Sequence, residues 1–72
     1  MFEIRNSGEV STAPNVQELF HKMSSMRDSH IAVHYSRRNG MKRVVFVTVT
    51  STGAAVQTYG MGSAITASDF AI

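Results

Sequence analysis

The chain has no cysteine, no tryptophan and a single proline. Without cysteine it can form no disulfide framework, thiolate nucleophile or cysteine-ligated zinc site, and it suits a reducing compartment. At 72 residues it lies near the lower size limit for a domain that folds without cross-links, a limit that oligomerisation often relieves. We therefore expect one cytoplasmic domain over residues 1–72.

Long apolar runs and a large net charge are missing too. No stretch approaches the roughly 18 apolar residues that span a bilayer, and the opening segment MFEIRNSGEV lacks the basic and apolar regions of a secretion signal. We therefore expect no membrane association. Seven Lys or Arg against five Asp or Glu give a net charge of only +2, so the total charge does not argue for nucleic-acid binding.

The sequence also lacks any recognisable set of catalytic or metal-binding residues. His30 and His34 would share a strand face, but about 13 Å of extended chain separates them, so the pair alone cannot chelate one metal ion. No nucleophile elbow or phosphate loop is present, and Gly60-Met61-Gly62 lacks the third glycine of a dinucleotide fingerprint. We predict a non-enzymatic protein with no catalytic residue, metal, cofactor or small-molecule substrate.

The clearest structural signal is a β-hairpin within His30 to Thr52. β-Branched and aromatic residues fill both arms, and Asn39-Gly40 is the preferred dipeptide for a two-residue type I′ turn. That turn would place Arg38 opposite Met41. The predicted core face then carries Ile31, Val33, Tyr35, Val44, Phe46 and Thr48.

The same register gives the hairpin a second face that is too apolar for solvent. It carries Val45, Val47 and Val49 beside His34. An antiparallel sheet with one solvated face normally alternates apolar and polar residues. We therefore predict that these four residues form an interface covered by the C-terminal tail, a target or a second copy, with a homodimer expected.

Basic residues cluster at the hairpin turn. Four of the seven lie between positions 37 and 43, with no acid among them: Arg37, Arg38, Lys42 and Arg43. Such residues bind phosphates, and a two-stranded ribbon fits the DNA major groove or can straddle an RNA backbone. We predict that this cluster contacts nucleic acid or a nucleoprotein complex. An acidic protein partner, or simple protection against edge-to-edge aggregation, remains the alternative.

The flanking segments predict a helix and further strands. Phe2 to Arg5 alternates as a short strand, residues 11–14 should be extended before Pro14, and Ala55 to Tyr59 can pair with the hairpin. Asn15 with Glu18 has capping-box spacing. The helix that follows would carry one apolar stripe, made of Val16, Leu19, Phe20, Met23 and Met26.

These elements predict an α+β fold in the order β-α-β-β-β. One helix would pack on an antiparallel sheet of three to four strands. For residues 60–72 the sequence leaves two alternatives, a C-terminal arm and a short helix. Ser63 could cap a helix, while Ile65, Phe70 and Ile72 could dock on a neighbour.

The run from Pro14 resembles a double-stranded-RNA-binding domain in outline. It has a helix, three strands whose first turn is basic, and Gly60-Met61-Gly62-Ser63 where that family has a Gly-x-Gly-x-Ser segment opening its second helix. The segment is one residue shorter than the family's, and no basic residue follows between Ala64 and Ala71. The resemblance favours nucleic-acid binding slightly and implies no residue roles.

A stand-alone interaction protein is the alternative function. A very short chain with a partly apolar sheet face is typical of inhibitors that phages and plasmids make against a host protein or defence complex. Such a protein would act as a homodimer through the valine face, using a few buried anchors and a charged rim.

Overall fold

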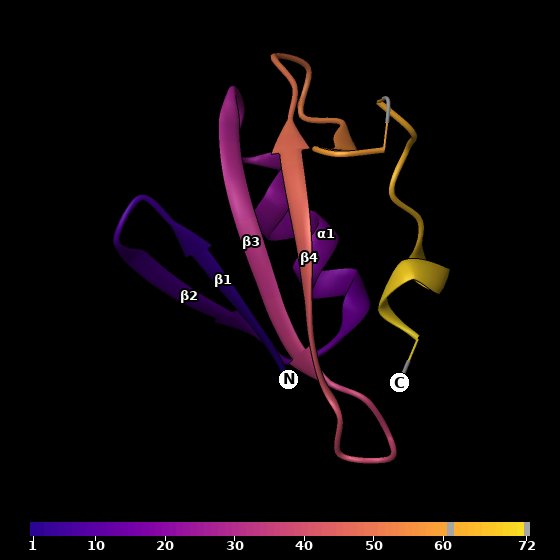
Figure 1. Ribbon diagram of the computed structural model, residues 1–72. Helices are drawn as coiled ribbons and strands as arrows, with labels where there is room; N and C mark the ends of the chain where they lie inside the picture. The colour runs from indigo at the N-terminus through magenta and orange to yellow at the C-terminus, as the bar shows by residue number, and fades with distance from the viewer. Residues whose placement is uncertain (61, 72) are drawn as a thin grey trace.

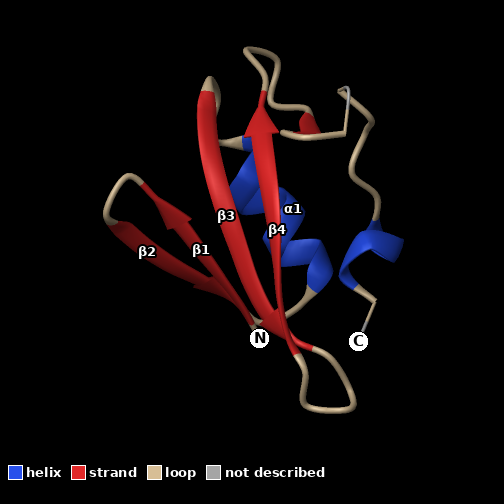
Figure 2. Ribbon diagram, viewed as in Figure 1, coloured by secondary structure: helices blue, strands red, loops and turns tan. Residues whose placement is uncertain are grey.

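The computed structural model describes residues 1–60 and 62–71 and has an antiparallel sheet with its longer helix packed against one face (Figures 1 and 2). The sheet has five strands in the order β2-β1-β3-β4-β5, so the predicted α+β class is confirmed with more strands than expected. None of the described helices is long and apolar enough to cross a membrane. The elements are β1 (Phe2–Asn6), β2 (Glu9–Ala13), α1 (Val16–Ser24), β3 (Ser29–Ser36), β4 (Lys42–Val49), β5 (Ala55–Gln57) and the 3₁₀-helix η1 (Ala67–Phe70).

An N-terminal hairpin adds β2, the strand that the sequence indicated only as an extended segment. Asn6 pairs with Glu9, and the two residues between them have φ angles of 49° for Ser7 and 89° for Gly8. Positive φ at both positions defines the type I′ turn. β1 also pairs with β3, so this hairpin extends the sheet at one side.

Helix α1 begins as predicted. The side-chain oxygen of Asn15 accepts a hydrogen bond of 2.8 Å from the backbone N–H of Glu18, which satisfies one of the free donors at the helix start. The predicted apolar stripe is confirmed for Val16, Leu19, Phe20 and Met23, of which Leu19 and Met23 are buried. Met26 also packs against the core, but it lies beyond the end of α1 at Ser24.

The central hairpin is present, but its predicted type I′ turn is wrong. The Gly40 N–H donates to the Arg37 carbonyl at 2.8 Å, and the Arg37 N–H donates to the Met41 carbonyl at 2.7 Å. Gly40 has a φ of 84°, whereas Asn39 is not among the residues with positive φ. This is a three-residue loop with a type I turn followed by a glycine bulge.

The extra loop residue shifts the register by one position and exchanges the two faces of β4. Val33 pairs with Val45, where Phe46 was expected. Val47 and Val49 are 0% exposed because they now face α1, while Phe46 is turned outward and 50% exposed. The core positions predicted for Val44, Phe46 and Thr48 are therefore wrong.

The predicted interface is wrong for the same reason. Val47 and Val49 lie inside the core, Val45 packs against it, and His34 pairs with Val44 on the opposite face of the sheet. These four residues do not form one surface.

Gly40 gives a direct test of this turn. Gly40→Ala should lower the free energy of unfolding by about 1 kcal/mol, because an L side chain disfavours positive φ. Gly40→Asn should cost less, since asparagine visits that region more readily. Urea denaturation measures both. A Cβ at Gly40 would meet no atom within 4 Å beyond its chain neighbours, so steric clashes do not contribute. Equal losses of unfolding free energy in the Ala and Asn variants would therefore contradict this conformational explanation.

The C-terminal segment closes the core of its own chain. The Phe70 ring centroid lies 5.7 Å from that of Phe2, 5.8 Å from that of Phe20 and 5.7 Å from that of Tyr35. The Tyr35 hydroxyl donates to the Asp69 carbonyl at 2.9 Å. Of the two options for residues 60–72, a short helix is present at η1, but it begins after Thr66 and not at Ser63. Ile65 and Phe70 are buried in the core of this chain and do not dock on a neighbour, and Ile72 lies outside the described residues.

The resemblance to double-stranded-RNA-binding domains does not extend to the fold. A hairpin precedes the helix, and the only helix after the strands in the described residues is the four-residue η1. Where that family has a second helix, this chain has a bridge between Val56 and Ala64 and a single 3₁₀ turn.

Candidate binding surface

The sheet face turned away from α1 and η1 forms a surface that we call the open face. Its side chains follow from the strand pairing, because residues alternate between faces along each strand. They are Glu3 and Arg5 of β1, Val10 and Thr12 of β2, His30, Ala32, His34 and Ser36 of β3, Lys42, Val44, Phe46 and Thr48 of β4, and Val56 of β5.

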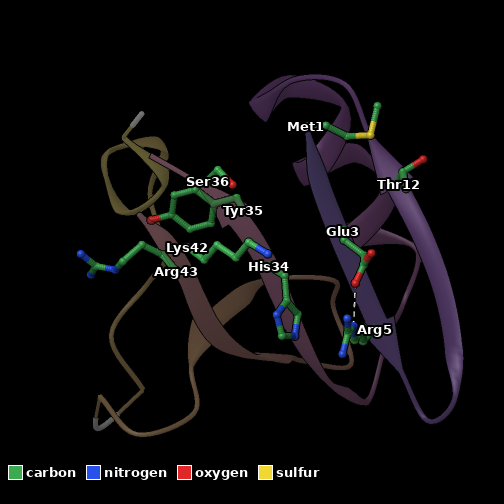
Figure 3. Close-up of a pocket in the computed structure, with 9 residues that line it drawn as sticks. All are labelled: Met1, Glu3, Arg5, Thr12, His34, Tyr35, Ser36, Lys42 and Arg43. Atoms are coloured by element: carbon green, nitrogen blue, oxygen red, sulfur yellow. Dashed lines mark hydrogen bonds and ion pairs between the residues drawn. The ribbon is translucent and has the colours of Figure 1, made fainter. Parts of the chain in front are cut away.

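The structure brings the predicted basic cluster together only in part. Arg37 and Arg38 lie in the loop beyond the sheet, while Lys42 and Arg43, the first residues of β4, point to opposite faces. Lys42 extends along the open face toward His34, and Arg43 points away from it (Figure 3). All four side chains are exposed, and none forms an ion pair within the described residues.

We call the loop between β3 and β4, together with Lys42 and Arg43 at the start of β4, the tip. A hollow of about 310 Å³ lies on the open face between β1 and the tip (Figure 3). Glu3, Arg5, His34 and Lys42 are among its lining residues. The Arg5 Nε lies 2.6 Å from a Glu3 carboxylate oxygen. Both side chains are partly exposed, so this pair orients Arg5 and contributes little to stability.

A second hollow of about 350 Å³ lies farther from the tip and is more apolar. Arg5, Ala32 and Phe46 form one cross-strand row, so the small Ala32 side chain makes the floor between a guanidinium and an aromatic ring. Tyr59 closes the far side, with its ring centroid 5.8 Å from that of Phe46 and an interplanar angle of 80°.

Hydrogen bonds fix the edges of this second hollow. The Thr58 N–H donates to the Phe46 carbonyl at 3.2 Å, and the hydroxyls of Thr48 and Thr58 are 3.0 Å apart. The His30 Nδ1 lies 3.0 Å from the same Thr48 oxygen. The segment that carries Tyr59 is thus attached to β4 beside the hollow.

Sequence reasoning missed this aromatic and basic row. Phe46 was expected in the core, and Tyr59 was expected to lie in a strand beside the hairpin. The alternation along β4 would have indicated Phe46 as an outward residue had the loop length been known. No group of three or more metal-ligating side chains occurs within residues 1–60 and 62–71.

The fold and this surface define a small α+β domain in which no described helix covers one face of the sheet, and that face carries aromatic and basic side chains. Comparisons of the chain with protein-family models, curated proteins and solved structures found no match. The chemistry of the surface itself is therefore the guide to function.

Proposed function

We propose that this chain is a small non-enzymatic protein that binds nucleic acid, alone or within a nucleoprotein complex, through the tip of the β3–β4 hairpin. One observation carries the proposal: four exposed cations lie at that end of the sheet, without ion-pair partners in the described residues. Cations in this state can exchange water for phosphate oxygens and release the counterions that nucleic acid condenses.

The distribution of acids supports this orientation. Asp28 precedes β3 and Glu9 follows the first hairpin turn, so both lie at the end of the sheet away from the tip. Three acids lie nearer to the tip. Glu3 is paired with Arg5, and Asp69 lines a hollow together with Arg37 and Arg43. Glu18 lies in the first turn of α1, which follows the tip end of β2. The four cations of the tip outnumber these acids. The tip therefore carries an excess of positive charge that favours a polyanion.

Removing two tip cations should weaken binding without regard to sequence. Arg37→Ala combined with Arg38→Ala should lower the affinity for single strands and duplexes alike. If both side chains contact phosphates, the slope of log affinity against log salt should fall by about 1.4 to 1.8. Fluorescence anisotropy with labelled oligonucleotides over a salt series measures both quantities.

Arg27→Ala is the matched control for the single substitutions Arg37→Ala and Arg38→Ala. Arg27 is also exposed, but it lies beyond the start of β3 at the other end of the sheet. Its removal changes the net charge equally and should leave the affinity nearly unchanged. Absence of binding to any nucleic acid by the native chain at about 50 mM salt, where phosphate contacts are strong, would contradict the proposal.

A protein partner is the second candidate, as for an inhibitor of phage or plasmid type that acts as a homodimer on a host protein or defence complex. The open face favours it, because Val10, Val44 and Phe46 are exposed there and apolar patches often mark interfaces. Sedimentation velocity over a concentration series separates the two candidate functions, since a dimer is expected only for the protein-binding candidate. The absence of cysteine makes a cytoplasmic location part of both proposals.

A further inference from the structure

We propose that the open face binds single-stranded nucleic acid, with an unpaired base in the hollow beside Phe46 and Tyr59 and the backbone running toward Lys42 and the tip. This inference rests on the proposed function and names the class of nucleic acid. It adds a base-binding site to the phosphate contacts of the tip.

The aromatic pair is held in an exposed position. Phe46 is 50% exposed and Tyr59 is 84% exposed, and the two rings meet edge to face. The hydrogen bonds of Thr58 to β4 hold the backbone next to Tyr59. Exposed aromatic side chains on a sheet stack on bases of any sequence, because every base has a π face.

Ala32 leaves room for a base beside these rings. Adjacent strands are about 4.8 Å apart, so Arg5 and Phe46, one strand away on each side of Ala32, have backbones separated by roughly 10 Å. A methyl group alone fills the floor of that gap. A guanidinium plane can also stack on a base, and Glu3 orients that of Arg5.

The two hollows are neighbours on the open face and mark a path for the backbone. Arg5 lines both of them, and the hollow nearer the tip is also lined by His34 and Lys42. Along β3, the distance from Ala32 to Ser36 at the tip end is about 13 Å. A strand with one base over Ala32 can therefore bring its phosphates past Lys42 to the loop arginines.

The charge of this path favours nucleic acid over a protein as the occupant. Lys42 lines this path, and the loop arginines Arg37 and Arg38 lie beyond its end. The charges of Arg5 and Glu3 on the open face offset each other within their ion pair. A duplex can reach the tip cations but cannot offer an unpaired base to the rings. The site should therefore prefer a single strand over a duplex.

Two substitutions test the base site from opposite directions. Phe46→Ala removes one stacking ring, and Ala32→Leu fills the hollow while leaving every ring and charge in place. Each should weaken binding of fluorescein-labelled oligo(dT) and oligo(rU) by about tenfold. Binding of a duplex of equal length, which depends on the tip, should change little.

Val10→Ala is the matched control for these substitutions. Val10 is an exposed apolar residue of the open face, but it pairs with Arg5 on the side away from Ala32. Its truncation should leave both affinities unchanged. Thermal melts followed by circular dichroism establish that all three variants are folded before they are compared.

Tyrosine emission gives an independent readout. The chain has two tyrosines and no tryptophan, and Tyr35 is buried while Tyr59 is exposed. Unlabelled oligo(dT) should quench the native emission, and Tyr59→Phe should abolish the quenching while retaining most of the affinity. Comparison of oligo(rU) with oligo(dT) in the binding measurements shows whether RNA, DNA or both are bound.

The outcomes separate this inference from the function on which it rests. If no nucleic acid binds, both proposals are overturned. If the native chain binds but Phe46→Ala and Ala32→Leu do not weaken the single-strand complex, or weaken the duplex complex equally, the base site alone is overturned. A dimer that Phe46→Ala dissociates would likewise overturn it, by showing a second copy on the open face.

Discussion

Phe70→Ala should lower the free energy of unfolding by about 3 to 5 kcal/mol, the range for removing a fully buried phenylalanine. The Phe70 ring is 1% exposed and touches rings from β1, α1 and β3. At about 0.05 to 0.15 kcal/mol per residue, a 72-residue domain has only about 4 to 11 kcal/mol of stability. This truncation should therefore leave a substantial unfolded population.

Phe46→Ala is the control for that experiment because it removes the same atoms from an exposed site. Phe46 is 50% exposed on the open face, so its truncation should cost about 1 kcal/mol or less. Urea denaturation followed by circular dichroism measures both variants. If Phe70→Ala lowered the free energy of unfolding as little as Phe46→Ala does, the segment carrying η1 would not belong to the cooperative core.

Local signals predicted α1 and the strands β1, β3 and β4, while β2 was indicated only as an extended segment. Asn15 and Glu18 are three residues apart, and that spacing alone locates the start of α1. The periodicity that begins at Val16 identifies the helix face that becomes buried. These predictions succeed because the cap depends on residues three apart and the apolar spacing follows the helical period, and both can be seen within one segment of the sequence.

The register of the central hairpin could not be predicted in the same way. Asn39-Gly40 suits a two-residue loop with positive φ at both residues, but it equally suits a three-residue loop in which only Gly40 has positive φ. The alternation along β4 does not choose between them, because Val44 and Phe46 are apolar on one face while Val45 and Val47 are apolar on the other. The three-residue loop sets the register, and this register places Val47 and Val49 in the core.

The candidate site was predictable where it depends on exposed charge. A cluster such as Arg37 and Arg38 at a hairpin turn lies at the surface under either register. The base site depends instead on three separate segments, since Arg5, Ala32 and Tyr59 meet only after β1 pairs with β3 and the chain returns beyond β5. No local pattern joins residues so distant in the sequence.

Val47→Glu should abolish folding. Val47 is 0% exposed and pairs with Ile31 on the face covered by α1. A carboxylate there loses its hydration and gains no cation, which costs several kcal/mol in addition to the lost valine packing. That sum is comparable with the whole stability expected for a domain of this size. Circular dichroism at 25 °C should show the loss of regular structure.

Val44→Glu is the comparison that makes this result a test of register. Val44 has the same residue type in the same strand, but it is 41% exposed and lies opposite His34 on the open face. The new carboxylate stays hydrated there, so the variant should fold and lose about 1 kcal/mol or less. With the two-residue loop the faces of β4 would be exchanged, and Val47→Glu would be the tolerated substitution. A folded Val47→Glu beside an unfolded Val44→Glu would therefore refute the observed pairing and, with it, the outward position of Phe46 on which the base site depends.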